Sequence, residues 1–384
     1  MMRFRGMMAV VACLSQALPA AAQAGREVVL GSPTASHSGE FSLLRLIREQ
    51  ADGSVLIADP IEGALVRLDK SLARATPLGR VGPGPGEYRQ PDAVWPLPGD
   101  SSLLVDLGNN RLTVLDPAGR FGNTRTLAEP SPDGGLKLLL PGGVDRAGGI
   151  YYRGGRPGDD SLPVFRFDRA TGQSTEVARY RGPAMRQESS GGENNRRQSV
   201  SSIPWAPADG WAVGASGRIF LVRAHDYHVE VINPDGSRTS GVPVRYTPVR
   251  IGAAERAEYD ASVQRGGSLG IEMRVSNGEP SLSMTRGRGR PGGAATSAAN
   301  FPATKPPFDP GDIWVDSRER LWVRRHQAAG QPALYDVFDQ RGSLVGSVRF
   351  GVNRRMAGMG KAAVYVARWD DDDLMYLERY ALPL

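Results

Sequence analysis

The chain repeats one short pattern six times: an apolar run that ends in a charged residue, followed closely by a second apolar run. The first runs cover residues 54–59, 102–106, 149–153, 218–223, 320–325 and 363–368. The second runs cover residues 65–69, 112–116, 164–168, 229–233, 335–339 and 375–380. Apolar runs of about four to eight residues between Gly, Pro, Asn and Asp predict strands. Units of about 40–50 residues with four short strands predict propeller blades, so we expect an all-β, six-bladed propeller.

The most complete unit runs from Arg80 to Phe121. A Gly/Pro loop (GPGPGEY, 82–88) leads to Pro91 and three strand-like runs, and the turn Asp116–Gly119 follows. Asp-Pro-x-Gly favours a tight turn because Pro fixes φ and Gly tolerates positive φ. The Gly/Pro loop, Pro91, Asp106, the segment Asn109–Arg111 and the turn together resemble the NHL repeat. The resemblance implies four-stranded antiparallel blades, and it implies an architecture rather than a function.

Two segments interrupt the period, at about residues 179–207 and 245–310. The first is rich in Gly, Ser and Asn, which indicates a flexible loop. In the second, residues 253–265 predict a short helix, whereas residues 266–299 are mostly Gly, Arg and Ser. In NHL-like propellers such insertions lie on the face that carries the loops between second and third strands. The last unit lacks a fourth strand, and we expect Glu27–Leu30 to supply it and close the ring.

The first 24 residues are typical of a secretory signal peptide. Arg3 and Arg5 precede an apolar stretch, and Ala22–Ala24 fits a cleavage site. Residues 10–13 also resemble a lipobox, which leaves lipid anchoring at Cys13 as an alternative. We therefore expect an exported protein, periplasmic or secreted, with residues 25–384 as one propeller domain. We expect no transmembrane helix in that domain, and we expect a monomer.

Cys13 is the single cysteine, so disulfides, thiolate catalysis and cysteine-zinc sites are excluded for residues 25–384. The 47 Lys and Arg residues exceed the 41 Asp and Glu residues by six, and two of the positive charges belong to the signal peptide. A mild positive excess suits an anionic small molecule, glycan or protein as the partner, and the alternative is that it is ordinary surface charge. We do not expect nucleic acid as a partner.

A charged residue ends each predicted second strand, where the strand opens toward the channel on the insertion face. These residues are Asp59, Asp106, Arg153, Arg223, Arg324 (or Arg325) and Arg368. Guanidinium groups gathered around one channel favour bidentate binding of carboxylate or phosphate. The alternative is that these arginines pair with Asp59, Asp106 or the run Asp370–Asp373 as internal struts.

Two groups of residues are candidate metal ligands. His225, His228 and His326 lie near second-to-third-strand loops and could bind zinc. The run Asp370–Asp373, with Asp370 and Asp372 as candidates, offers oxygen ligands for calcium. Without such a site, no cofactor is expected.

Three functions remain open. The first is a non-catalytic binding module with a basic channel mouth. The second, suggested by lyases and lactonases of similar propeller type, is a metal-dependent enzyme acting in the channel. The third is a structural component of a cell-envelope assembly.

Overall fold

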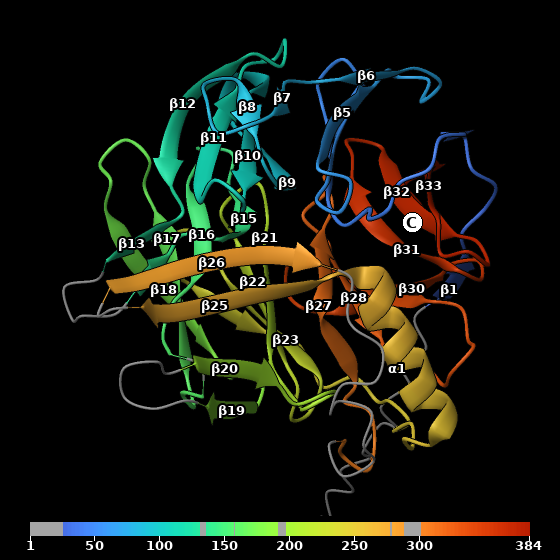
Figure 1. The fold of residues 1–384 in the computed structure, drawn as a ribbon. Helices are drawn as coiled ribbons and strands as arrows, with labels where there is room; N and C mark the ends of the chain where they lie inside the picture. The colour runs from blue at the N-terminus through green and yellow to red at the C-terminus, as the bar shows by residue number, and fades with distance from the viewer. Residues whose placement is uncertain (1–25, 131–135, 157, 191–196, 277–278, 288–300) are drawn as a thin grey trace, which may run out of the picture.

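A computed structural model describes residues 26–130, 136–156, 158–190, 197–276, 279–287 and 301–384 of the chain. Six antiparallel sheets surround a common axis, as Figure 1 shows nearly face-on. This arrangement confirms the predicted six-bladed propeller. The predicted signal peptide and Cys13 lie outside the described residues. No helix among those described is long and apolar enough to cross a membrane.

Each blade begins with its innermost strand. The innermost strands are β3 (Ile47–Glu49), β9 (Pro91–Pro96), β15 (Pro141–Val144), β21 (Gly210–Val213), β27 (Phe308–Val315) and β31 (Arg354–Met359). The second strands are β4 (Val55–Asp59), β10 (Ser102–Asp106), β16 (Ile150–Arg153), β22 (Ile219–Arg223), β28 (Leu321–Arg325) and β32 (Ala363–Trp369). Each innermost strand contacts the innermost strands of both neighbouring blades, so the six close a ring around the channel.

The outer half of each blade follows the predicted repeat. The third strands are β5 (Ala64–Leu68), β11 (Arg111–Leu115), β17 (Leu162–Phe167), β23 (His228–Ile232), β29 (Leu334–Phe338) and β33 (Met375–Ala381). The outermost strands of the first five blades are β6 (Ala75–Pro77), β12 (Phe121–Thr126), β18 (Ser174–Tyr180), β24 (Arg238–Ser240) and β30 (Leu344–Arg349). Shorter elements are β7 (Arg80–Val81), β8 (Glu87–Tyr88), η1 (Pro98–Asp100), β13 (Ala128–Pro130) and β14 (Leu136–Leu138).

The N-terminal chain closes the ring, although not with the residues that the sequence indicated. Strand β2 (Ala35–Ser36) pairs antiparallel with β33 and completes the sixth blade. Strand β1 (Arg26–Val29) instead pairs parallel with β30 as a fifth strand of the fifth blade. Its position is held by the ion pair between Glu27 and Arg349 at 2.6 Å and by the buried side chain of Leu30. A four-residue segment with only three apolar residues (Val28–Leu30) cannot by itself specify which of two adjacent sheet edges it joins.

The core consists of apolar layers between neighbouring blades. Six buried clusters lie within the described residues, one at each contact between blades. Leu56 and Leu104 join the first two blades, for example, and Trp322 and Val364 join the last two. Because every blade packs on two others, the innermost strands are held firmly around the channel.

Both insertions carry regular structure, and their strands join in one sheet. Strands β19 (Met185–Ser190) and β20 (Arg197–Ser202) form one hairpin, and β25 (Ser268–Ser276) and β26 (Glu279–Gly287) form another. Strand β20 pairs with β25, so the order is β19-β20-β25-β26; we call these four strands the cap sheet. The helix predicted at 253–265 is confirmed as α1 (Ala253–Gly266).

The sequence indicated irregular loops where the cap sheet lies. The signal for β25 was present, because Leu269, Ile271, Met273 and Val275 alternate with polar or small residues. The high Gly, Ser and Arg content concealed that alternation. The two halves of the sheet are also far apart in sequence, so their pairing has no local signal.

Candidate functional site

The cap sheet lies across the insertion face of the propeller (Figure 1). Leu269 and Met284 of its second hairpin pack on the apolar layer between the second and third blades. At the end of β26, Arg286 forms a buried ion pair with Asp92 of β9. The second hairpin is therefore fixed on the ring.

Topology places charged residues at the channel mouth beneath this cap. In each blade the innermost strand begins, and the second strand ends, on the insertion face. Asp92 and Arg355 are the second residues of β9 and β31, and Arg45 lies just before β3. Asp312 lies just before Ile313, where the regular pairing of β27 with β28 begins. We call Arg45, Asp92, Arg286, Asp312, Arg324 and Arg355 the channel-mouth cluster.

Arg45 is held in a position that disfavours its charge. Its Nη1 lies 3.5 Å from Asp92 Oδ2, but Arg286 already occupies both carboxylate oxygens of Asp92. Burial lowers the pKa of Arg45 to about 10, Asp92 partly offsets this, and the charges of Arg286 and Arg355 lower it further. The guanidinium is thus surrounded by more positive charge than one carboxylate balances.

Arg355 has the least compensated charge of the cluster. Its guanidinium donates to the carbonyl of Leu44 at 3.2 Å, and no carboxylate of the described residues lies within ion-pair distance. Desolvation lowers the pKa of Arg355, the more distant Asp312 opposes this shift, and Arg324 adds to it. The side chain is nevertheless partly exposed.

On the opposite side of the channel mouth, Asp312 and Arg324 have polar or charged partners among the blade residues. Asp312 accepts hydrogen bonds from the hydroxyl of Tyr335 at 2.9 Å and from the indole of Trp314 at 2.6 Å. Arg324 lies 3.5 Å from Asp312 and 4.0 Å from Asp309. Burial disfavours the charged form of Arg324, but Asp312 outweighs it, and the pKa rises above its usual value. Of the arginines predicted to bind an anion, Arg324 is the one that this cluster contains.

A pocket of about 70 Å³ adjoins the cluster beneath α1. Lys305 lies buried there, with its Nζ 4.5 Å from the ring centre of Trp205 and 3.1 Å from Glu258. His326 lines the same pocket, and its Nδ1 lies 2.9 Å from the carbonyl of Pro306. Burial lowers the pKa of His326, so the imidazole is neutral at neutral pH. The pocket is large enough for a few water molecules.

Asp59 and Asp106, which the sequence suggested as ligand-binding residues, make the same kind of contact in their two blades. Asp59 accepts hydrogen bonds from the backbone amides of Ser42 and Leu43, at 2.7 and 3.2 Å. Asp106 accepts in the same way from the amides of Arg89 and Gln90, at 3.1 and 3.0 Å. Each aspartate thus fastens the chain segment that leads into its own blade, and a ligand-binding role for either stays a prediction.

The other predicted arginines are engaged by side chains of the blades. Arg223 binds both carboxylate oxygens of Glu230 (3.0 and 2.8 Å), and Arg325 binds both oxygens of Asp336 (2.8 and 2.7 Å). Arg368 lies 3.1 Å from Glu378 and over the ring of Tyr376. Arg153 is exposed beside Tyr180. The first three pair across the second and third strands and so brace the blades, but their partners are Glu230, Asp336 and Glu378 rather than Asp59, Asp106 or the run Asp370–Asp373.

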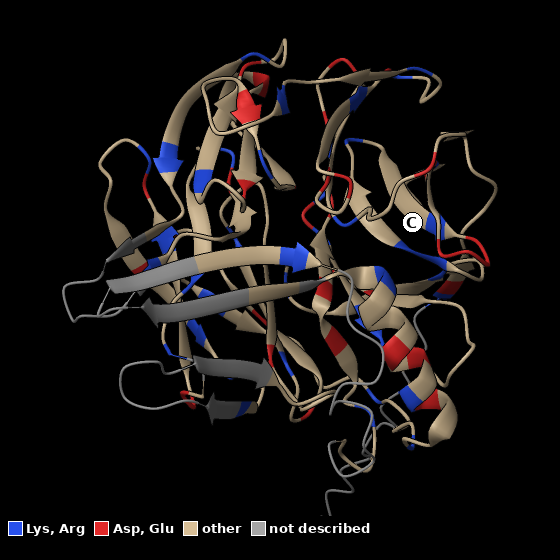
Figure 2. Cartoon of the chain, in the orientation of Figure 1, with Lys and Arg blue, Asp and Glu red and all other residues tan. Residues whose placement is uncertain are grey.

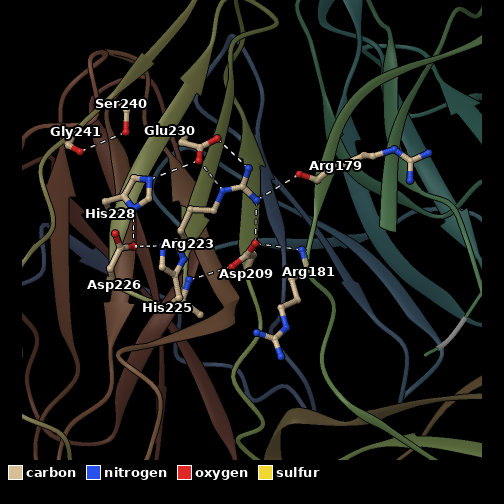
Figure 3. A network of polar contacts seen from close by, with 11 residues as sticks. Arg179, Arg181, Asp209, Arg223, His225, Asp226, His228, Glu230, Ser240 and Gly241 are labelled. Carbon is tan, nitrogen blue, oxygen red and sulfur yellow. Dashed lines mark hydrogen bonds and ion pairs between the residues drawn. The ribbon is translucent and has the colours of Figure 1, made fainter. Parts of the chain in front are cut away.

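Of the predicted metal ligands, His225 and His228 lie close to each other in the structure. The side-chain nitrogens of His225 and His228 and a carboxylate oxygen of Asp226 lie within 4.8 Å of one another (Figure 3). His326 is not part of this group. Asp370 caps its own turn by accepting from the amide of Leu374 at 3.0 Å, and Asp372 is exposed in that turn.

A larger hollow, of about 860 Å³, lies between the third and fourth blades near Asp145, where the innermost strand ends. Asp145 in its lining is contacted by Arg166 and by the hydroxyl of Tyr151, at 2.8 and 3.2 Å, and Arg146 also lines the hollow. Elsewhere basic and acidic residues are interspersed over the blades (Figure 2). The channel-mouth cluster contains four arginines and two aspartates, and this excess of positive charge makes the channel mouth our candidate for an anion site.

Comparison with known proteins identifies the architecture. No protein-family model and no curated protein matches the chain. A solved structure of a DUF4221 family member from Bacteroides vulgatus shares 9% identity at a TM-score of 0.50, covering 94% of this chain and 100% of its own. Virginiamycin B lyase from Staphylococcus aureus shares 11% identity at 0.39, over 93% and 98% of the two chains. A luciferin-regenerating enzyme shares 13% at 0.43, over 91% and 96%. The similarity to the DUF4221 structure supports the fold alone, and not a function.

Proposed function

We propose that this protein is an exported binding module that holds an anionic group of a small molecule, glycan or protein at its capped channel mouth. The observation that carries the proposal is Arg355, a partly exposed guanidinium near the start of the innermost strand β31, without a carboxylate of the described residues at ion-pair distance. A carboxylate or phosphate between Arg355 and Arg45 would supply the missing negative charge. Guanidinium groups suit both anions because their paired N–H donors match two oxygens at once.

The lowered pKa of Arg45 and of Arg355 supports the same conclusion. Both shifts mean that the surroundings disfavour the positive charge, so an anion that relieves this would bind favourably. The cap strengthens the effect, because an ion pair in a region with little water is screened less than one at the surface.

The braced arginines have a complementary role in this proposal. Arg223, Arg325 and Arg368 hold the loops around the mouth through their carboxylate partners. Direct ligand contacts from them, and from Arg153, stay predictions. The alternative of a metal-dependent lactonase or lyase in the channel also stays a prediction. The group of His and Asp ligand atoms that the described residues bring together belongs to the fourth blade's outer loop, not to an innermost strand.

The test measures binding of defined anions to the untagged chain. Citrate, D-glucuronate and inorganic phosphate are titrated by calorimetry, with glucose as the neutral control. We expect at least one anion to bind, with an affinity that falls as salt is added. Arg355→Met should weaken that binding by at least about tenfold, or 1.4 kcal/mol. Arg238→Met, which removes an exposed arginine of β24, should leave it unchanged. Equal binding by the Arg355 variant would refute the proposed site.

A further inference from the structure

The loop between β22 and β23 brings two imidazoles and a carboxylate to one point (Figure 3). Asp226 Oδ1 lies 3.2 Å from His225 Nε2 and 2.5 Å from His228 Nδ1. The two imidazole rings are 5.6 Å apart and nearly perpendicular, at 89°. Two nitrogens and one oxygen therefore face a common centre.

This convergence depends on the backbone of Tyr227. In a continuous strand, residues three positions apart point to opposite faces. Here Tyr227 has a φ of +53°, in the left-handed region. The backbone therefore changes direction at Tyr227, and His228 lies on the same side of the loop as His225. A bulky residue in that region is rare and costs free energy, so its surroundings must hold it there.

Buried contacts hold Tyr227 in place. Its hydroxyl donates to Asp336 Oδ2 at 2.5 Å, and its ring stacks on Phe308 with centroids 5.4 Å apart. The side chain is fully buried. The geometry of the loop is thus set by the contact between the fourth and fifth blades rather than by the exposed residues themselves.

A second group of contacts orients His228. Its side chain is 12% exposed, and its Nε2 lies 3.5 Å from Glu230 Oε1. Arg223 binds both oxygens of Glu230 and also Asp209, so Glu230 is itself fixed (Figure 3). A carboxylate on one imidazole nitrogen, with the other nitrogen turned to a shared centre, is the usual support of a metal-binding histidine.

We propose that His225 Nε2, Asp226 Oδ1 and His228 Nδ1 bind a divalent transition-metal ion of the zinc class. Zinc accepts histidine nitrogen and carboxylate oxygen at about 2.0–2.2 Å. Tetrahedral ligand atoms at that radius lie about 3.3 Å apart. The 3.2 Å separation of His225 from Asp226 meets this requirement, and Asp226 needs to move away from His228 by less than about 1 Å.

The donor set also selects the metal. Two imidazoles and one carboxylate favour zinc, copper or nickel, whereas calcium prefers oxygen ligands throughout. The His225 side chain is 67% exposed, so the fourth coordination position faces solvent and is open to water or to a ligand atom. This site differs from the predicted zinc group in that Asp226 replaces His326.

The experiment measures zinc binding by the untagged chain that begins at residue 25. After treatment with chelator, Zn²⁺ is titrated by calorimetry, and metal content is measured by inductively coupled plasma mass spectrometry. Co²⁺ replaces Zn²⁺ in a parallel sample, because its visible absorption reports coordination by nitrogen and oxygen. We expect one ion per chain and the absorption of a four- or five-coordinate Co²⁺ site.

Three variants test the ligands. His225→Ala removes an exposed side chain and should fold normally, with zinc affinity lower by about tenfold or more. Glu230→Gln changes the residue that positions His228 and should lower the affinity by about 10–100-fold. His326→Asn alters a histidine outside the loop and should bind like the unaltered chain. Absence of zinc binding overturns the inference, as does zinc binding that His225→Ala and Glu230→Gln leave unchanged.

Discussion

Arg286 of the cap sheet and Asp92 of the second blade form a buried ion pair between residues 194 positions apart in sequence. Their side chains are 7% and 3% exposed. The backbone of Arg286 also exchanges hydrogen bonds with the Gln90 side chain, at 2.9 and 2.8 Å. Oδ2 of the same carboxylate lies 3.5 Å from Arg45 Nη1, and Asp92 balances part of the charge of Arg45. The attachment of the cap and the electrostatics of the channel mouth thus depend on one aspartate.

The first prediction concerns this attachment. Arg286→Met should destabilise the docked cap, because it leaves the carboxylate of Asp92 buried with Arg45 as a weaker partner. The cost of removing one member of a buried pair is about 3–5 kcal/mol, and the remaining arginine places this case at the lower end. Hydrogen exchange measured by mass spectrometry should accelerate in β25 and β26 while the blades stay protected.

The double variant Asp92→Asn with Arg286→Met provides the control. It removes both charges, so we expect it to lose less stability than the two single variants combined. Unchanged exchange in the Arg286 variant, or strict additivity in the double variant, would mean that the ion pair does not hold the cap.

A second prediction separates binding from stability at the channel mouth. Arg355→Met removes a charge that its surroundings disfavour, so it should leave the free energy of unfolding unchanged or raise it by up to about 2 kcal/mol. Arg223→Met should do the opposite and cost about 1–3 kcal/mol, because it leaves Glu230 and Asp209 without their partner. Urea denaturation of both variants measures the difference. A large loss of stability in Arg355→Met would show that the arginine is structural.

The sequence predicted the blades well because their signal is local. Each second and third strand is a continuous apolar run closed by turn residues, and the structure has these strands within a few residues of the predicted bounds. Strand β1 was placed in the wrong blade because the choice between two neighbouring sheet edges is made by distant partners. One such partner is Arg349, which pairs with Glu27.

The sequence indicated part of the channel-mouth cluster, and here too residues with a local sequence signal could be found whereas those placed by distant partners could not. The sequence indicated Arg324 or Arg325 near the end of the second strand of the fifth blade. Arg325 ends β28 and pairs with Asp336, whereas Arg324, one position earlier, lies in the channel-mouth cluster. Arg45, Asp92 and Arg355 were missed, although all three lie at or just before the start of an innermost strand on the same face. A charged residue at the start of an innermost strand is therefore a sequence signal for a channel-mouth position in a propeller. Arg286 has no such signal, because its place depends on the pairing of two insertions.

The third prediction concerns the loop that carries His225 and His228. Tyr227→Phe removes the hydroxyl that donates to the buried Asp336 and should cost about 1–3 kcal/mol of unfolding free energy. Arg325 continues to bind Asp336, so the variant should still fold. Tyr246→Phe alters a ring that contacts Tyr227 but not the Asp336 contact, and should stay within about 0.5 kcal/mol. Equal stability of the two variants in urea would contradict the proposed anchoring.

The last prediction is a pH dependence that arises from His326. Burial lowers the pKa of this imidazole, so below about pH 6.5 the unfolded chain binds more protons there than the folded chain. The contribution of the neutral His326 to the free energy of unfolding is therefore fully present above pH 6.5. It declines as the pH falls toward the lowered pKa, by at most about 1.4 kcal/mol per pH unit. His326→Asn removes the titrating group, and urea denaturation between pH 5 and 7.5 should show a smaller decline. Ser262→Ala changes the same pocket without a titratable group and should keep the decline of the unaltered chain. An identical decline in the His326 variant would mean that the imidazole is protonated as easily in the fold as in the unfolded chain.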